Sequence, residues 1–440
     1  MSDVLIIGGG FAGLSAATAL AEQGLRVALL EARKRLGGRA YSFRDEVTGD
    51  TVDNGQHLFM ACYRETRRFL ARIGTERHLR FQPDLRVDFR TPDAQRTALK
   101  CPRLPAPYHL LAGLASLSTV SVGDIFRLRH VMADLAVGDP CARSALTVSG
   151  WLRSRRQSEG IISSFWTPLT VATLNESPDV ASAGGLAAVL RHGLMGSRED
   201  ARLGLSVVGL SDLYTDAARR YVEERGGEVR LGAPVAAIDR QGDRCEGVTL
   251  RDGTRLTADA VVSAVPHTAL IPLLPQADPL RALRASPIVS VNVWFDRPVM
   301  AEPFAGLLGT ECQWAFNRSM ILNSPGRGHV ALVISAARQH IRLPQRDLVR
   351  LAVADLRRLF PEARNARVTR AFAVKEREAT LSAGVGVVRP KQQSPVRNLF
   401  LAGDWTDTGL PATVESAVVS GHRCAEMITG IRNQEQRRRN

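Results

Sequence analysis

The chain has 440 residues, 45% of them hydrophobic and 23% charged, and a formal net charge of +14. This length predicts about two or three domains, and the composition is that of a soluble globular protein. Nearly all the positive charge is arginine, because the only lysines are Lys34, Lys100, Lys375 and Lys391. With five tyrosines and no run of basic residues interleaved with aromatics, the sequence predicts no nucleic-acid partner.

The six cysteines are scattered and form no C-x-x-C pair, so we expect no metal site, no disulfide framework and a reducing, cytoplasmic location. The start of the chain lacks the basic and apolar pattern of a signal peptide. The longest uncharged run, 104–123, contains two prolines and several hydroxyl residues, which makes it a poor spanning helix. We expect it to line a lipid channel or to give peripheral contact with the inner membrane face.

The beginning of the chain follows the order of a dinucleotide-binding unit. An apolar strand is expected at 4–7, a helix at 14–23 that stops at Gly24, and a second strand at 26–31 that ends in Glu31. A G-x-G-x-x-G turn lies between the first strand and the helix, with Gly8, Gly10 and Gly13. Strand, glycines, helix, strand and acid in this order predict a dinucleotide site much more strongly than the glycines alone.

Each part of this unit has a physical task. Gly8 allows the tight turn, Gly10 lets the backbone approach a pyrophosphate, and Gly13 lets the helix pack against the strand. Free N–H groups at the helix start face the phosphate, and Glu31 accepts hydrogen bonds from ribose hydroxyls. The residues expected at the cofactor here are Gly8, Gly10, Phe11, Ala12, Gly13, Glu31, Ala32 and Arg33.

The residues after Glu31 run Ala-Arg-Lys-Arg-Leu-Gly-Gly-Arg, and here the sequence resembles the FAD-binding amine oxidase and phytoene desaturase superfamily. The resemblance implies FAD as cofactor, with Gly38 and Arg39 at its phosphates. It also implies Gly403 and Asp404 at the ribityl phosphate, and a helix N-terminus at the flavin ring. The residues that it adds are Gly38, Arg39, Val235 (at the adenine), Gly403, Asp404, Thr413 and Val414. Taken alone, Asp404 has a simpler interpretation as a helix cap.

The middle of the chain alternates strands and helices, and the resemblance returns it to the FAD domain. A helix from 211 ends at the glycines 226–227, strands follow at 228–231 and 235–238, a hairpin joins 245–250 to 255–256, and a buried strand covers 258–266. We therefore predict an α/β fold with a discontinuous Rossmann-type FAD-binding domain (1–62, 206–272 and 388–440). An α+β substrate domain is inserted in it, mostly helical over 63–205 and with strands at 288–295 and 330–334 in its second part, 273–387.

A row of polar residues, Asp53-Asn54-Gly55-Gln56-His57, follows a predicted hairpin and leads straight into an apolar run. In the superfamily this segment runs beneath the flavin ring, which implies backbone contact at Gly55, with Gln56 and His57 near the ring edge or the substrate. We take His57 as the candidate proton donor, because an imidazole can carry a proton near neutral pH. Asp53 is its candidate orienting partner if the chain turns at Gly55. A capping or hydrogen-bonding role is the alternative for His57, and Glu415 or a bound water is the next candidate acid.

Three blocks, at 53–57, 165–175 and 401–416, together resemble the hydroxysqualene dehydroxylase family. The resemblance spans nearly the whole chain and implies reductive removal of an allylic hydroxyl from hydroxysqualene, giving squalene for hopanoid synthesis. A hydride from flavin N5 would reach an allylic cation after a general acid protonates the hydroxyl. The electron donor cannot be identified. Candidates for an apolar channel are Leu110, Leu111, Leu114, Phe165, Trp166, Val293 and Trp294, although each alone is as well explained as ordinary core.

Two other functions compete with this interpretation. The first is oxidation by a carotenoid-type desaturase or an amine oxidase of the same superfamily. Amine oxidases use aromatic walls and often a lysine at the flavin, which five tyrosines and four lysines hardly supply. The second is a redox-silent carrier of prenyl lipids, like the Rab dissociation inhibitors on a related fold. A carrier should lose the flavin determinants that this chain retains, and it would purify colourless.

Overall fold

The computed structural model describes residues 2–274, 278–324 and 328–439. Its first large sheet has the order β10-β2-β1-β13-β12-β11, with β19 beside β13. The parallel strands are β1 (Ser2–Ile7), β2 (Val27–Glu31), β10 (Glu228–Leu231), β13 (Arg255–Ser263) and β19 (Leu399–Leu401). An antiparallel edge is added by β11 (Val235–Gln241) and β12 (Arg244–Leu250).

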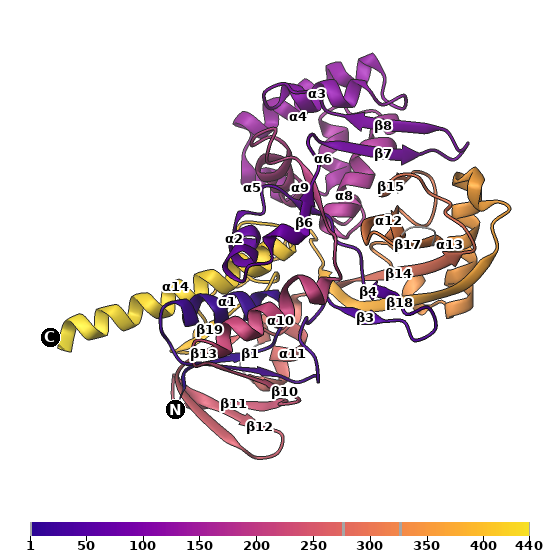
Figure 1. Cartoon of the computed structure of the whole chain (residues 1–440). Coiled ribbons are helices and arrows are strands. Elements are labelled where there is room, and N and C mark those ends of the chain that lie inside the picture. The colour runs from indigo at the N-terminus through magenta and orange to yellow at the C-terminus, as the bar shows by residue number, and fades with distance from the viewer. Residues whose placement is uncertain (1, 275–277, 325–327, 440) are drawn as a thin grey trace.

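Three helices from distant parts of the chain cover one face of this sheet: α1 (Phe11–Glu22), α10 (Leu210–Glu223) and α14 (Val414–Arg439), with α14 projecting from the body toward the C-terminus (Figure 1). Gly421 makes the crossing of α14 over α1 possible, because a Cβ there would lie 2.3 Å from the Ala12 carbonyl oxygen. Strand, glycine turn, helix, strand and acid thus occur in the predicted order.

One strand prediction was wrong in its detail. The return strand of the hairpin and the buried strand at 258–266 are a single strand, β13. Its first half pairs antiparallel with β12 and its second half parallel with β1. No turn residue interrupts it, so a change of partner occurs within one continuous strand.

The second large sheet has the order β18-β14-β17-β16-β15-β7-β8. Its strands are β18 (Val368–Leu381), β14 (Ala285–Phe295), β17 (Gly328–Ile334), β16 (Trp314–Asn317), β15 (Phe304–Leu307), β7 (Arg86–Arg90) and β8 (Arg96–Lys100). Helix α13 (Gln345–Leu359) packs on one face. The β7–β8 hairpin comes from the segment expected to be mostly helical, and β7 pairs in parallel with β15. Both insertions therefore share one sheet.

The helical layer lies over the other face of this sheet (Figure 1). It contains α3 (Tyr108–Ala115), α4 (Val122–Val137), α5 (Pro140–Ser144), α6 (Val148–Ser154), α7 (Glu159–Ile161), a π-helical turn (Ile162–Trp166), α8 (Thr167–Leu174), α9 (Ala183–Val189) and a second π-helical turn (Leu190–Leu194). The uncharged run forms α3 and the start of α4. Across the three described ranges, no helix combines the length and the apolarity needed to cross a membrane.

Smaller elements join the two large sheets. A hairpin of β3 (Ser42–Arg44) and β4 (Thr51–Asp53) leads into the polar row, and β5 (Phe59–Met60), β9 (Leu203–Ser206) and β6 (Leu79–Phe81) form a three-stranded sheet. Helices α2 (Arg64–Arg72), α11 (His267–Leu270) and α12 (Arg318–Ile321) complete the elements used below. The predicted fold class is confirmed, whereas the exact domain boundaries stay a prediction.

Candidate active site

The glycine turn after β1 brings backbone into direct contact with backbone. Gly8 has a φ of +105°, which L side chains rarely adopt. A Cβ on Gly13 would lie 1.9 Å from the Gly8 carbonyl oxygen. Glycine at 13 is therefore required by the packing of α1 against the turn, before any ligand is considered.

Gly10 differs from its neighbours, because the space beside it is open. The nearest atom to a Cβ added there is the Cα of Gly38, at 3.7 Å. Gly10 precedes α1, whose first turn has no capping side chain and no acid, so its N–H groups are available to an anion. This cradle of Gly10, Gly38 and the start of α1 fits the diphosphate of a dinucleotide.

Glu31 lies beside the cradle and is buried. One carboxylate oxygen accepts from Gly9 N at 2.8 Å and the other from Arg33 N at 2.9 Å. A carboxylate has about four acceptor positions, so the ribose hydroxyls can still be bound. Ala233 N donates to the Glu31 carbonyl at 2.9 Å, which brings the segment leading into Val235 to the same acid.

An ion pair between Arg39 and Asp404 joins the N-terminal motif to the C-terminal one. The Asp404 side chain is buried, whereas that of Arg39 is partly exposed. Arg39 also donates to the Ala379 carbonyl at 3.1 Å. The interpretation of Asp404 as a simple helix cap is wrong, because its carboxylate is paired with an arginine 365 positions away. Thr413 instead accepts from Ser416 N at 3.2 Å and caps α14, whose first residue is Val414.

Asp53, at the end of β4, ties the two parts of the protein together. Its Oδ1 accepts from Ser42 Oγ at 2.6 Å and from Leu210 N at 3.0 Å, while its Oδ2 lies 2.8 Å from Nη2 of Arg318. Both oxygens are therefore occupied. The predicted pairing of Asp53 with His57 is wrong, and the partner of Asp53 is an arginine that sequence analysis did not single out.

The next residues of the row have separate partners. Asn54 donates to the Arg39 carbonyl and to Glu376 Oε1, both at 2.9 Å. No heavy atom lies within 4 Å of a Cβ added to Gly55, so this residue faces open space. Gln56 accepts from Arg318 Nη1 at 2.8 Å. The chain thus presents bare backbone at Gly55 between two anchored side chains.

His57 is half-buried, next to the Gln56 side chain that accepts from Arg318. Burial lowers the pKa of His57 below its ordinary value of 6.5, and the charge of Asp53 partly opposes this shift. The imidazole of the free protein is therefore mostly neutral at pH 7. It is available to a ligand but becomes a strong proton donor only at lower pH.

The buried pair of Arg318 and Asp53 gives a stability prediction. Both side chains are 3% exposed, so Arg318→Met leaves a carboxylate buried without its cation. We expect unfolding free energy to fall by about 3–5 kcal/mol in urea titrations. Arg26→Met is the matched control, because Arg26 is 63% exposed beside Asp3 and its pair contributes at most about 1 kcal/mol. Equal losses in the two variants would contradict a structural role for the buried pair.

Glu415, the next candidate acid, is hydrogen-bonded to α2. It accepts from Glu65 N at 2.9 Å, Thr66 N at 2.8 Å and Thr66 Oγ1 at 2.6 Å, and so caps the start of α2. Burial raises the pKa of Glu415, and these hydrogen bonds oppose the rise. With its oxygens held by α2, Glu415 is not placed to protonate a substrate.

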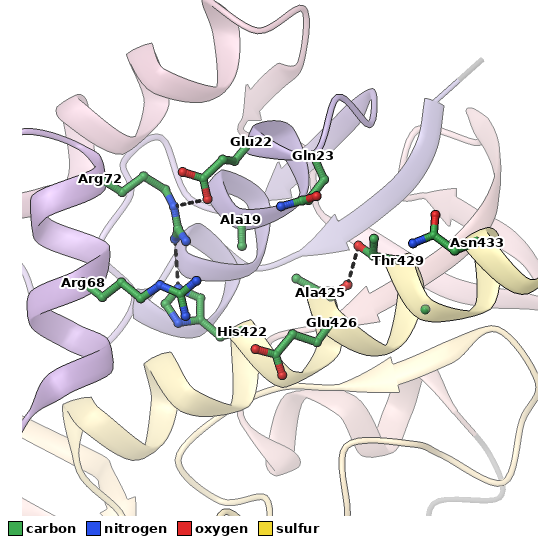
Figure 2. Close-up of a pocket in the computed structure, with 11 residues that line it drawn as sticks. Ala19, Glu22, Gln23, Arg68, Arg72, His422, Ala425, Glu426, Thr429 and Asn433 are labelled. Atoms are coloured by element: carbon green, nitrogen blue, oxygen red, sulfur yellow. Dashed lines mark hydrogen bonds and ion pairs between the residues drawn. The ribbon is translucent and has the colours of Figure 1, made fainter.

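A surface pocket of about 340 Å³ lies between α1, α2 and α14 (Figure 2). Arg72 joins its two sides, with Nε 3.0 Å from Glu22 and Nη1 3.0 Å from His422 Nε2. None of the predicted site residues lines it. This network fastens α2 to α14 and is separate from the polar row.

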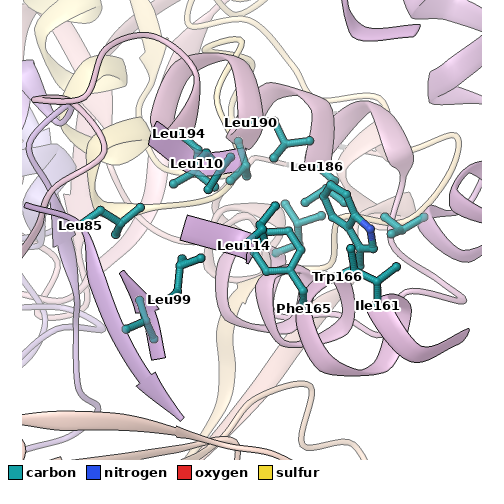
Figure 3. Close-up of a cluster of buried hydrophobic side chains, with 14 of the residues drawn as sticks. Leu85, Leu99, Leu110, Leu114, Ile161, Phe165, Trp166, Leu186, Leu190 and Leu194 are labelled. Carbon is teal, nitrogen blue, oxygen red and sulfur yellow. The ribbon is translucent and has the colours of Figure 1, made fainter. Parts of the chain in front are cut away.

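Apolar side chains gather in the helical layer (Figure 3). Leu110, Leu111, Leu114, Phe165 and Trp166 line one common cavity, and their role in a substrate channel stays a prediction. The cavity encloses only about 20 Å³, room for about one water.

The other two channel candidates lie elsewhere. Val293 belongs to the core between the second sheet and α13, so its assignment to the channel was wrong. Trp294, on the opposite face of β14, stacks on His329 with ring centroids 3.9 Å apart. It lines the polar end of the sheet face and not the apolar cavity.

The sequence pattern of the flavin containing amine oxidoreductases matches residues 11–429. The chain belongs to this family. As a flavin containing amine oxidoreductase it uses FAD as its cofactor, and the predictions of an FAD-dependent oxidoreductase and of its fold are confirmed.

Individual family members give a finer comparison. Hydroxysqualene dehydroxylase of Sinorhizobium fredii (strain NBRC 101917 / NGR234) is 31% identical over 98% of this chain and 99% of its own length. The enzyme of that name from Rhodopseudomonas palustris is also 31% identical, over 97% and 98%. The 15-cis-phytoene desaturase of Solanum lycopersicum is 25% identical over 97% of this chain and 77% of its own.

Two solved structures share the fold. Putrescine oxidase bound to putrescine has a TM-score of 0.73 and 17% identity, covering 98% of this chain and 99% of its own. A putative protoporphyrinogen oxidase from Exiguobacterium sp. 255-15 has a TM-score of 0.70 and 19% identity, covering 97% and 98%. At these identities the likeness concerns the fold alone.

Proposed function

We propose that this protein catalyses the FAD-dependent reductive dehydroxylation of hydroxysqualene to squalene. The observation that carries the proposal is the 31% identity to two hydroxysqualene dehydroxylases over nearly the whole of both chains. In the reaction a C–O bond breaks, a C–H bond forms, and the hydroxyl leaves as water after gaining a proton. Reduced FAD, when bound, supplies the hydride and is thereby oxidised.

The residues of this chain have three tasks in the proposal. The glycine cradle, Glu31 and the Arg39–Asp404 pair hold the cofactor. The apolar side chains of the helical layer exclude water and align a hydrocarbon chain. His57, at the open end of the polar row, delivers the proton. We assign to the cofactor Gly8, Gly10, Phe11, Ala12, Gly13, Glu31, Ala32, Arg33, Gly38, Arg39, Gly55, Gln56, His57, Val235, Gly403, Asp404, Thr413 and Val414.

Desaturation is the alternative to test, because phytoene desaturases also match, at 25–26% identity over 77–79% of their length. The two reactions run the flavin in opposite directions. Reduced protein should convert hydroxysqualene to squalene, and oxidised protein should leave 15-cis-phytoene unchanged. Conversion of phytoene, with none of hydroxysqualene, would assign the chain to desaturation.

We further infer that the protein contacts a membrane surface through α3 and α4. Tyr108 is 63% exposed, Val122 88% and Phe126 66%, and the guanidinium of Arg129 lies 3.6 Å from the Phe126 ring centroid. Apolar side chains beside arginine suit an anionic bilayer surface. The electron donor is inferred to be a separate redox partner, because the chain has no second G-x-G-x-x-G motif.

The membrane inference predicts flotation with anionic vesicles at low salt and release at high salt. The double variant Val122→Ser/Phe126→Ser should lose about 10-fold or more in vesicle affinity, because it removes two apolar side chains that the bilayer would bury. Val137→Ser is the control, since Val137 is equally exposed at the far end of α4. Unchanged flotation of the double variant would exclude this surface.

A further inference from the structure

Two fully buried polar side chains lie on one face of β14. Val289, Val291 and Val293 of β14 point into the core with α13. Ser290 and Asn292 alternate with them and therefore lie on the opposite face, toward the helical layer. Their β17 partners on that face are Val333 and Ala331, both part of the apolar cluster of the helical layer. Both polar side chains are 0% exposed.

Several buried polar atoms on and near this face of β14 have no hydrogen-bond partner. Among the residues that the structure describes, twelve buried side-chain nitrogen or oxygen atoms have no hydrogen-bond partner, and three of them are Gln56 Nε2, Ser290 Oγ and Asn292 Nδ2. A buried polar group without a partner is destabilising, so natural cores contain few. Their occurrence together indicates that a bound group supplies the missing hydrogen bonds.

A chain of contacts links these residues. Arg318 donates to Gln56 Oε1 at 2.8 Å, and burial, together with the charge of Arg318, lowers the pKa of His329 to about 3. The neutral His329 lies with Nε2 3.0 Å from Asn292 Oδ1. With Nε2 protonated, His329 donates to this oxygen and fixes the amide of Asn292. The amide nitrogen Nδ2 of Asn292 is then left free to donate.

We propose that Ser290 Oγ, Asn292 Nδ2 and Gln56 Nε2 form a binding site for the hydroxyl oxygen of an allylic alcohol. The proposal rests on the proposed function and adds the residues that recognise the substrate. The three groups donate to an oxygen acceptor, at the border between an apolar cavity and the row that ends in His57. A hydrocarbon such as squalene has no oxygen to offer and leaves all three unpaired.

The site also has a part in the reaction. As the C–O bond breaks, its electron pair remains on the oxygen, which takes one proton and departs as water. The three donors stabilise the oxygen while it gains negative charge and then hold the water. The carbon receives the hydride that the proposed function assigns to reduced FAD, so atoms and electrons balance. The hydrocarbon product has lost these hydrogen bonds and is released more readily than the alcohol.

Binding to oxidised holoenzyme tests the site without turnover, because the oxidised cofactor has no hydride to give. Hydroxysqualene and squalene would each be titrated against the flavin absorbance spectrum. Wild-type protein should bind the alcohol at least about 10-fold more tightly than the hydrocarbon. Ser290→Ala and Asn292→Leu should each reduce this preference about 3- to 10-fold while squalene affinity stays the same or rises.

Thr119→Val is the matched control, because it also removes a buried hydroxyl without a partner, in the loop between α3 and α4. It should keep the wild-type preference. Ser290→Ala should also keep wild-type thermal stability, since its hydroxyl has no partner to lose. If both β14 variants keep the wild-type preference for the alcohol, the proposed site is wrong but the proposed function is not affected. Wild-type protein that neither prefers nor converts the alcohol would overturn the proposed function and the site with it.

Discussion

Gly10→Val should give a folded protein without its yellow colour. A Cβ at this position meets only the Cα of Gly38, at 3.7 Å, so the protein itself tolerates a side chain. The same space is the one that the cofactor diphosphate must enter, and the branched side chain fills it. We expect complete loss of bound flavin, measured as the ratio of flavin to protein absorbance, with an unchanged far-ultraviolet circular dichroism spectrum.

Gly13→Val provides the contrast within the same motif. Its Cβ would lie 1.9 Å from a backbone oxygen, so this variant should fail to fold and not merely lose flavin. A Gly10→Val protein that purifies with full flavin content would show that the diphosphate lies elsewhere. Loss of the fold in Gly10→Val would show that the cradle is tighter than the structure indicates.

His57→Ala should slow dehydroxylation by about 10²- to 10⁴-fold, the usual contribution of a general acid, while flavin content stays normal. The pH dependence follows from the lowered pKa of His57. Because the protonated imidazole is the active form, wild-type kcat/KM should rise as the pH falls through a pKa below 6.5. His57→Ala should remove this rise.

Reduction of the flavin by dithionite is the control for His57→Ala, because it needs no protonation of a substrate and should proceed at the wild-type rate. Wild-type dehydroxylation in His57→Ala would make the imidazole structural. Since Glu415 is held by the first turn of α2, the acid would then have to be a bound water.

The parts of the site that are best predicted from the sequence are those in which backbone groups bind the cofactor. The strand, the glycines of the first turn and Glu31 lie close together along the chain, so their order is enough to identify the unit. The row from Asp53 to His57 was found for a similar reason, because polar residues between a strand and an apolar run are unusual. The alternation Arg-Val-Asp-Phe-Arg at 86–90 also signals a strand, so β7 could have been predicted.

Partners far apart in the chain could not be predicted. Arg318 is one of many arginines, and nothing near it in the sequence indicates a pair with Asp53, 265 residues earlier. Ser290 and Asn292 sit in a strand whose valines alternate with them, but their lack of partners is visible only once the neighbouring side chains are placed. The prediction for Asp53 failed because Leu210 and Arg318, both distant in the chain, hold its carboxylate.

The most direct test of the proposed dehydroxylation is an anaerobic single turnover. Photoreduced holoenzyme would be mixed with hydroxysqualene while flavin absorbance and squalene are followed together. Our account predicts that the oxidised flavin spectrum returns and that squalene forms in amounts equal to the flavin. Reduced flavin that persists beside unchanged hydroxysqualene, in a protein with full flavin content, would contradict it.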